Sequence, residues 1–153
     1  MRYVAPIVEG HGEVEALPAL LHRIAEAIGC RASLRVNPPI RVKSASFLHD
    51  QGYFHKQVSL AAAKAAQMDG VVLILLDCED DCPASLGPDL LCRAEAVRAD
   101  ARVIVALAYR EYETWFLAAA RSLRGQHGLP KDLEPPRVPE SIRNAKGWLG
   151  KRM

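Results

Sequence analysis

Short apolar runs recur along this chain of 153 residues and predict four β-strands. All six residues at 71–76 are apolar, and the lack of alternation indicates a strand buried on both faces. The run at 102–108 indicates a second buried strand. Residues 33–43 alternate but are interrupted by Asn37-Pro38-Pro39, so we expect a strand or a bent hairpin there. The first strand is expected at Tyr3–Val8.

Apolar residues at helical spacing predict helices in the segments between the strands. Leu17, Leu21, Ile24 and Ile28 predict a helix with one face on the sheet. Because proline is tolerated only in a first turn, Pro18 places the expected start near Glu15 or Ala16, and Gly29 is expected to end the helix. Residues 44–53 indicate a loop. Further helices are predicted at 54–68 (inner face Val58, Ala61, Ala62, Ala65), 86–99 and 111–123.

The alternation of strands and helices predicts an α/β fold of the Rossmann-like type, with a mostly parallel sheet of about four strands and helices on both faces. The length is typical of one domain, which we place at residues 1–124. Residues 125–153 are expected to form a loop and a C-terminal helix at 140–149. Its apolar side (Ile142, Ala145, Trp148, Leu149) either docks back on the sheet or awaits a partner, another copy or a different chain.

Composition narrows the class of protein. No apolar run approaches the roughly 18–20 residues of a membrane span, and the N-terminus lacks the basic start and apolar core of a signal peptide. The four cysteines show no paired framework and indicate reduced thiols in a cytoplasmic protein. The formal net charge is +2, yet nine of the 18 acidic residues lie in three short segments. An acidic centre in a basic body suits a metal site that attracts a polyanion.

These acidic segments follow predicted strands. Glu9 ends the first strand and Asp77 ends the run at 71–76, and ligands of open parallel sheets bind at the carboxyl edge. Carboxylates crowded there repel one another unless Mg²⁺ or Mn²⁺ neutralises them. We therefore expect Glu9, Glu13 and Asp77 to be catalytic. The expected metal ligands are Glu9, Asp77, Glu79, Asp81, Glu111 and Glu113. The alternative is that acids after a strand favour the start of the next helix, which suffices for Glu13 and suits Glu111 and Glu113.

Other motifs are weaker. Gly10 and Gly12 permit a tight turn and a close backbone approach to phosphate or metal. They do not complete a dinucleotide fingerprint, because Glu15 stands where GxGxxG requires glycine. Cys78 and Cys82 lack a second pair for zinc. His11 is expected to be solvated, and Trp115 and Phe116 are expected in the core.

Three segments carry a family resemblance: VEGHGEVEALPALLHRI, VVLILLDCEDDCP and VIVALAYREYETWFLA. They resemble the bacterial proteins grouped as domain of unknown function 4276, a family similar in its core to the TOPRIM domains of OLD-type nucleases, topoisomerases and primases. The tail segment PESIRNAKGWL also looks like that family. The resemblance implies that Glu9, Asp77 and Glu79 jointly hold Mg²⁺, with Asp81 as an alternative to Glu79. It implies a further metal ligand at Glu111 or Glu113.

Three functions follow from these observations. The first is Mg²⁺-dependent nuclease or other phosphoryl-transfer activity on nucleic acid, DNA rather than RNA. The second is a non-catalytic TOPRIM-like module that acts with an ATPase partner, as the resemblance implies for phage defence. The third, with Asp77 accepting a phosphoryl group as in receiver domains, is disfavoured because no lysine follows the strand at 102–108.

Overall fold

The computed structural model describes residues 2–30 and 32–153 and divides into two compact units. The first, here called the sheet unit, comprises Met1–Leu76 and Ala84–Ala106. The second, here called the C-terminal unit, comprises Asp77–Pro83 and Leu107–Met153. The second and third acidic segments of the sequence therefore belong to the C-terminal unit, and the first acidic segment belongs to the sheet unit.

A parallel sheet forms the centre of the sheet unit, as the sequence predicts. Its order is β2-β1-β4-β5, and β3 also pairs with β1. β1 is parallel to β2, β3 and β4, with Val8 opposite Leu75 in the last of these pairs. The strands are β1 (Arg2–Val8), β2 (Leu34–Val36), β3 (Ile40–Arg41), β4 (Val71–Asp77) and β5 (Arg102–Ala108).

Residues 33–43 form one interrupted strand, not a hairpin. β2 and β3 both run parallel to β1, and Pro38-Pro39 lies between them. Proline has no N–H to donate to the ladder, which explains the break.

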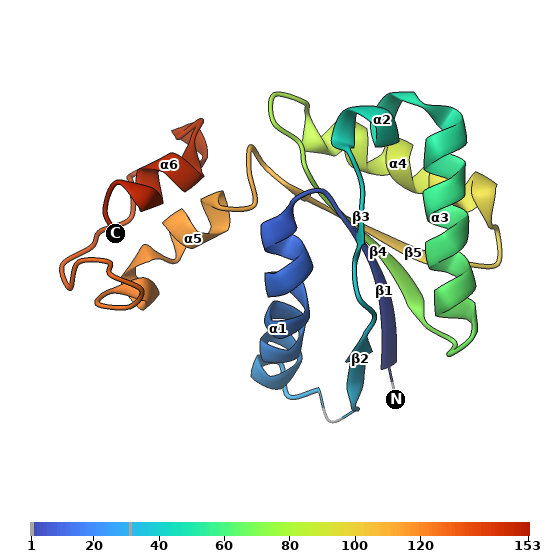
Figure 1. Ribbon diagram of the computed structural model, residues 1–153, viewed down its shortest axis with the longest axis horizontal. Coiled ribbons are helices and arrows are strands. Elements are labelled where there is room, and N and C mark those ends of the chain that lie inside the picture. The colour runs from blue at the N-terminus through green and yellow to red at the C-terminus, as the bar shows by residue number, and fades with distance from the viewer. Residues whose placement is uncertain (1, 31) are drawn as a thin grey trace. The chain divides into compact units, whose positions relative to one another are not determined.

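Helices cover both faces of the sheet, with α1 on one and α3 and α4 on the other (Figure 1). The connection from β1 to β2 therefore passes over one face of the sheet, and the connection from β3 to β4 passes over the other. This places the topological switch point between β1 and β4. Ligands of such sheets bind outside the carboxyl ends of the strands at this point. The helices of the sheet unit are α1 (His11–Ala27), α2 (Ser44–His49), α3 (Gln51–Ala66) and α4 (Pro83–Val97).

The predicted start of α1 was wrong. The helix begins at His11 and carries Pro18 in its interior. A proline there removes one backbone hydrogen bond, and packing of Leu17, which is buried, keeps the helix continuous. The predicted end was correct: Gly29 has φ +65°, and the N–H groups of Gly29 and Cys30 donate to the carbonyls of Glu26 and Ala25 in a Schellman motif.

Two predicted buried faces are partly exposed. Of the four apolar residues predicted to face the sheet from the first helix, only Leu17 is buried, whereas Ile24 is 46% and Ile28 is 75% exposed. On β5, Ile104 is 52% exposed. α1 contacts β2 and β3, and β5 lies at the edge of the sheet, so no described helix of the sheet unit covers β5 on that face. A continuous apolar run therefore did not mean burial on both sides.

Residues 44–53, expected as a loop, form α2 and the start of α3. Phe47 is fully buried and its ring centroid lies 4.7 Å from that of Phe54. The Asp50 carboxylate accepts a hydrogen bond from the Tyr53 N–H (2.9 Å) and caps α3. The predicted inner face of α3 (Val58, Ala61, Ala62, Ala65) is confirmed. α4 begins at Pro83, ahead of the predicted 86, because proline suits a first helical position.

The C-terminal unit has its own small core. Leu129 and Leu133, in a segment expected to be a loop, are buried with Ala120, and Trp148 and Leu149 pack against them. The apolar side of the tail is therefore covered within the unit. The predicted helices at 111–123 and 140–149 are shorter in the structure: α5 (Thr114–Ala118) with a 3-10 turn at Ala120–Leu123, and α6 (Ala145–Gly150) after a 3-10 turn at Pro139–Ser141. Asn144 begins α6 by accepting from the Gly147 N–H (2.6 Å).

Candidate functional site

The candidate site is a charged cluster of the C-terminal unit where β4 and β5 end. Beyond the strands the backbones remain paired, since the Cys78 N–H donates to the Ala108 carbonyl (3.0 Å) and the Glu79 N–H donates to the Arg110 carbonyl (3.1 Å). The second and third acidic segments therefore run side by side. A cavity of about 190 Å³ lies among Glu79, Asp80, Arg110, Glu111 and Arg143.

Two residues of this cluster have a strained backbone. Glu79 has φ +45° and Arg110 has φ +70°, the left-handed region that non-glycine residues rarely adopt. Each such residue costs on the order of 1–3 kcal/mol, and such strain concentrates at functional sites. The two strained residues are joined by the hydrogen bond from the Glu79 N–H to the Arg110 carbonyl.

Asp77 ends β4 and is half-buried. Its Oδ1 accepts a hydrogen bond from the Tyr112 N–H (2.8 Å), which ties the end of β4 to the segment after β5. Asp77 thus has a structural contact in addition to the chemical role expected from the sequence.

Asp80 is clamped by two arginines. Arg110 forms an ion pair with it, and Arg143 Nη1 lies 3.1 Å from it. Hydrogen bonds from Arg143 and Arg110 hold the pKa of the Asp80 carboxyl below its ordinary value. Arg110 Nε is buried without a hydrogen-bond partner among the described residues, so this guanidinium has an N–H left to donate. The two arginines bring guanidinium groups to a cavity whose other lining residues are the acids Glu79, Asp80 and Glu111.

Glu111 contacts the tail. Its Oε2 accepts from the N–H groups of Ala145 (3.1 Å) and Lys146 (3.5 Å) at the start of α6. Glu79 and Asp81 are exposed, and Glu113 is half-buried directly before α5. The cavity thus includes Glu79 and Glu111 of the predicted metal ligands, while Asp81 and Glu113 lie outside its lining.

The first acidic segment lies in the sheet unit at the end of β1. Glu9 is half-buried, and Glu13 is 8% exposed in the first turn of α1. Gly10 is extended (φ −90°), so left-handed freedom is not its role. A Cβ at Gly10 would overlap the Glu13 carboxylate, whereas one at Gly12 would meet no atom within 4 Å. Gly10 therefore leaves the space that the Glu13 side chain occupies. His11 is exposed, as expected.

The acidic side chains that the structure describes do not form a closed metal cage. Among residues 2–30 and 32–153, no three His, Cys, Asp or Glu side chains lie close enough together to hold a metal ion. Magnesium commonly takes only one or two protein carboxylates and completes its shell with water and substrate phosphate. The carboxylates at the ends of β4 and β5 have the oxygen chemistry that Mg²⁺ requires, although they do not form a cage.

Sequence reasoning missed the two arginines and Tyr112. Arg110 could have been found, because it follows the strand at 102–108 and precedes Glu111. Arg143 gives no local signal, since it reaches the site only because the tail folds back within the C-terminal unit. Trp115 was expected in the core but is 40% exposed, with its ring 5.2 Å from that of Tyr112; α5 is too short to bury it on both sides.

The fold and the cluster define an α/β protein with a Rossmann-like parallel sheet and a charged, strained site at the ends of β4 and β5. The model of the family described as Domain of unknown function (DUF4276) matches residues 8–152, and the chain belongs to that family. No curated protein and no solved structure matches the chain. In the part of the chain that the structure describes, no helix has the length and apolar character to cross a membrane.

Proposed function

We propose that this chain is a Mg²⁺-dependent enzyme of the TOPRIM type that cleaves phosphodiester bonds of nucleic acid, DNA rather than RNA. The observation that carries the proposal is the backbone pairing of Cys78 and Glu79 with Ala108 and Arg110 at the ends of β4 and β5. It brings carboxylates and arginines into one strained cluster, and both kinds of group are needed to act on a phosphate.

The chain's own residues would bind and orient the substrate. Arg110 and Arg143 would donate to phosphate oxygens, since a guanidinium matches the geometry of a phosphate better than an ammonium does. Asp77 and Glu79 would hold the metal, with Asp81 as an alternative to Glu79, and a metal-bound water would manage the proton. When bound, Mg²⁺ would supply Lewis acidity at the phosphate and lower the pKa of water.

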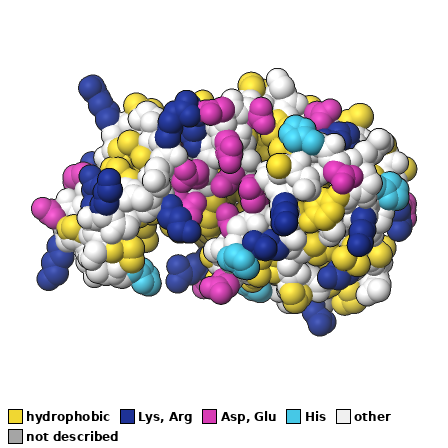
Figure 2. Space-filling model, turned by 45° about the horizontal axis from the view of Figure 1, so that its top comes forward, with side chains coloured by type: hydrophobic (Ala, Val, Ile, Leu, Met, Phe, Trp, Pro, Cys, Tyr) yellow, Lys and Arg dark blue, Asp and Glu magenta, His cyan; other side chains and the backbone are white. Residues whose placement is uncertain are grey.

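Basic and acidic side chains are interspersed on the face drawn in Figure 2, and neither sign forms one uniform area there. A long duplex would gain little from such a surface through charge alone, because affinity of that kind needs clustered cations. On this face, recognition is therefore expected to be local, at a phosphate beside Arg110 and Arg143.

The second candidate is a non-catalytic binding module that acts with an ATPase partner in phage defence. The observation that favours it is the engagement of the carboxylates: Asp80 is paired with arginines and Glu111 with backbone N–H groups. Carboxylates held in this way stabilise the fold and are less available to a metal.

The test is cleavage of supercoiled and single-stranded DNA in Mg²⁺, Mn²⁺ or EDTA, with calorimetric titration of Mn²⁺. Asp77→Asn keeps an oxygen that accepts from the Tyr112 N–H while removing the charge, so it separates chemistry from folding. Asp132→Asn, at an exposed position of the same unit, is the matched control. Metal-dependent cleavage lost in Asp77→Asn and kept in Asp132→Asn would support the enzyme. Absence of both cleavage and Mn²⁺ binding in the wild type would refute it and leave the binding module.

A further inference from the structure

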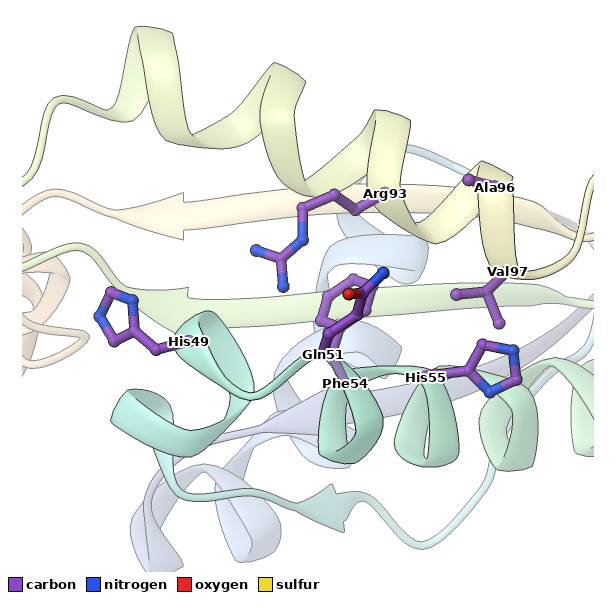
Figure 3. Close-up of a pocket in the computed structure, with 7 residues that line it drawn as sticks. All are labelled: His49, Gln51, Phe54, His55, Arg93, Ala96 and Val97. Atoms are coloured by element: carbon purple, nitrogen blue, oxygen red, sulfur yellow. The ribbon is translucent and has the colours of Figure 1, made fainter.

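The sheet unit contains a cavity of about 330 Å³ between the α2–α3 corner and the second half of α4 (Figure 3). It shares no residue with the cluster at the ends of β4 and β5. Its volume is at the lower end of the roughly 300–1,000 Å³ of small-molecule sites. The cavity is therefore large enough for one small organic ligand and too small for a stretch of duplex.

One wall of the cavity is polar and includes one cationic side chain, that of Arg93. Arg93, His49, His55 and Gln51 contribute to it, and none of the described residues that line it is acidic. In Figure 3, Arg93 reaches from α4 toward Phe54 and Gln51, with His49 on one side and His55 on the other. The nearby Asp50 carboxylate is engaged by the Tyr53 N–H and is not part of the lining. Such a wall favours an anion.

Arg93 is held by the ring of Phe54 and by a long ion pair with Asp89. Its Cζ lies 4.2 Å from the centroid of the Phe54 ring, which is buried, so the ring fixes the plane of the guanidinium. Arg93 Nη1 forms an ion pair with the Asp89 carboxylate at 3.6 Å, which is longer than a hydrogen bond, and the Asp89 side chain is 60% exposed, so the pair is weak. A preordered guanidinium with N–H groups left to donate is the arrangement that binds a phosphate in a bidentate manner.

The remaining wall is apolar. Val97 and Ala96 form it, and Val97 lies beside His55 at the end of the cavity away from His49 (Figure 3). A ligand that fills the cavity therefore needs an anionic end and an apolar or aromatic end.

We infer that this cavity binds a phosphate monoester whose organic part is small and apolar or aromatic. The phosphate lies between Arg93, His49 and Gln51, and the organic part packs on Val97 and Ala96. A free mononucleotide and the 5′-phosphate end of a nucleic acid both carry this chemistry. The inference does not depend on the proposed nuclease activity, because the two sites lie in different units.

The test is calorimetric titration of the intact protein with AMP, adenosine, inorganic phosphate and a 5′-phosphorylated oligonucleotide, with NMR of the histidine rings in parallel. AMP is expected to bind at least tenfold more tightly than adenosine, which corresponds to about 1.4 kcal/mol. The ring signals of His49 and His55 should shift, and those of His22 and His127 should not. Whichever of AMP and the oligonucleotide binds more tightly identifies the source of the phosphate.

Arg93→Gln should weaken AMP binding about tenfold or more, and Arg93→Lys should weaken it less because the charge remains. Arg23→Gln, at an exposed arginine on α1, is the matched control and should bind as the wild type does. Since Arg93 also packs on Phe54, His49→Asn provides a second variant at an exposed position that should weaken binding without unfolding the protein. Equal affinity for AMP and adenosine, no saturable AMP binding at millimolar concentration, or equal losses in Arg93→Gln and Arg23→Gln would overturn the inference.

Discussion

The two glycines before and within α1 are expected to respond to alanine with opposite signs. Gly12 lies inside the helix, and a Cβ there meets no atom within 4 Å. Gly12→Ala should therefore stabilise the protein by about 0.5–1 kcal/mol, because alanine loses less backbone entropy in a helix. Gly10 is the residue that caps α1, and a Cβ there overlaps the Glu13 carboxylate.

Gly10→Ala should destabilise by about 1 kcal/mol. A few tenths of a kcal/mol come from the poorer N-cap. The rest comes from displacing the buried Glu13 side chain, and this cost lies at the low end of the roughly 1–3 kcal/mol of overpacking because the carboxylate end of Glu13 is flexible. For a chain of this length 1 kcal/mol shifts Tm by about 2–4 °C. The two variants should therefore differ in Tm by roughly 3–8 °C when measured by differential scanning calorimetry.

The control is to measure the cost of Gly10→Ala again in two variants of Glu13. In Glu13→Gln the side chain keeps its size, so Gly10→Ala should cost as much as in the wild type. In Glu13→Ala the overlapping atoms are gone, and the cost should fall to the few tenths of the cap. Stabilisation of the protein by Gly10→Ala, or the same cost in all three backgrounds, would refute the assignment of Gly10 as the space for Glu13.

Three further outcomes are expected. Asp80→Asn should lower Tm at neutral pH, because arginines lower the folded-state pKa of Asp80. The difference in Tm from the wild type should persist above the ordinary pKa of 3.8 and disappear as the pH falls below the lowered pKa. Burial raises the pKa of the Cys78 thiol, so dithionitrobenzoate should label the exposed Cys92 in the folded protein and Cys78 only after unfolding. Leu133→Ala should cost about 2–5 kcal/mol by urea denaturation, whereas Ile104→Ala, at a half-exposed position, should cost less; equal costs would contradict the burial of Leu133.

The sequence was informative where local pattern and tertiary packing agree. The strands at 3–8, 71–76 and 102–108, the parallel α/β class and the inner face of α3 were all predicted, because each has a strong pattern of its own. The end of α1 at Gly29 was predicted for the same reason.

The errors arose where distant packing decides the outcome. Residues 44–49 are helical because Phe47 is buried against Phe54, and the local sequence pattern does not predict that contact. Ile24, Ile28 and Ile104 are exposed because β5 is an edge strand and α1 lies over β2 and β3, which depends on strand order. The clamp on Asp80 likewise needs Arg143, which is far away along the chain.

Glu111 offers the sharpest separation between a structural and a chemical role at the candidate site. If its contacts with the Ala145 and Lys146 N–H groups are its main function, Glu111→Gln should be mild, because the amide oxygen still accepts them. Glu111→Ala should then destabilise by about 1–3 kcal/mol, since the Ala145 N–H is left without its acceptor. If Glu111 instead binds metal, Glu111→Gln should weaken Mn²⁺ binding while leaving Tm near that of the wild type. Calorimetry with Mn²⁺ and a thermal melt of the same two variants distinguish these roles, and a loss of both properties in Glu111→Ala alone would assign Glu111 to the fold.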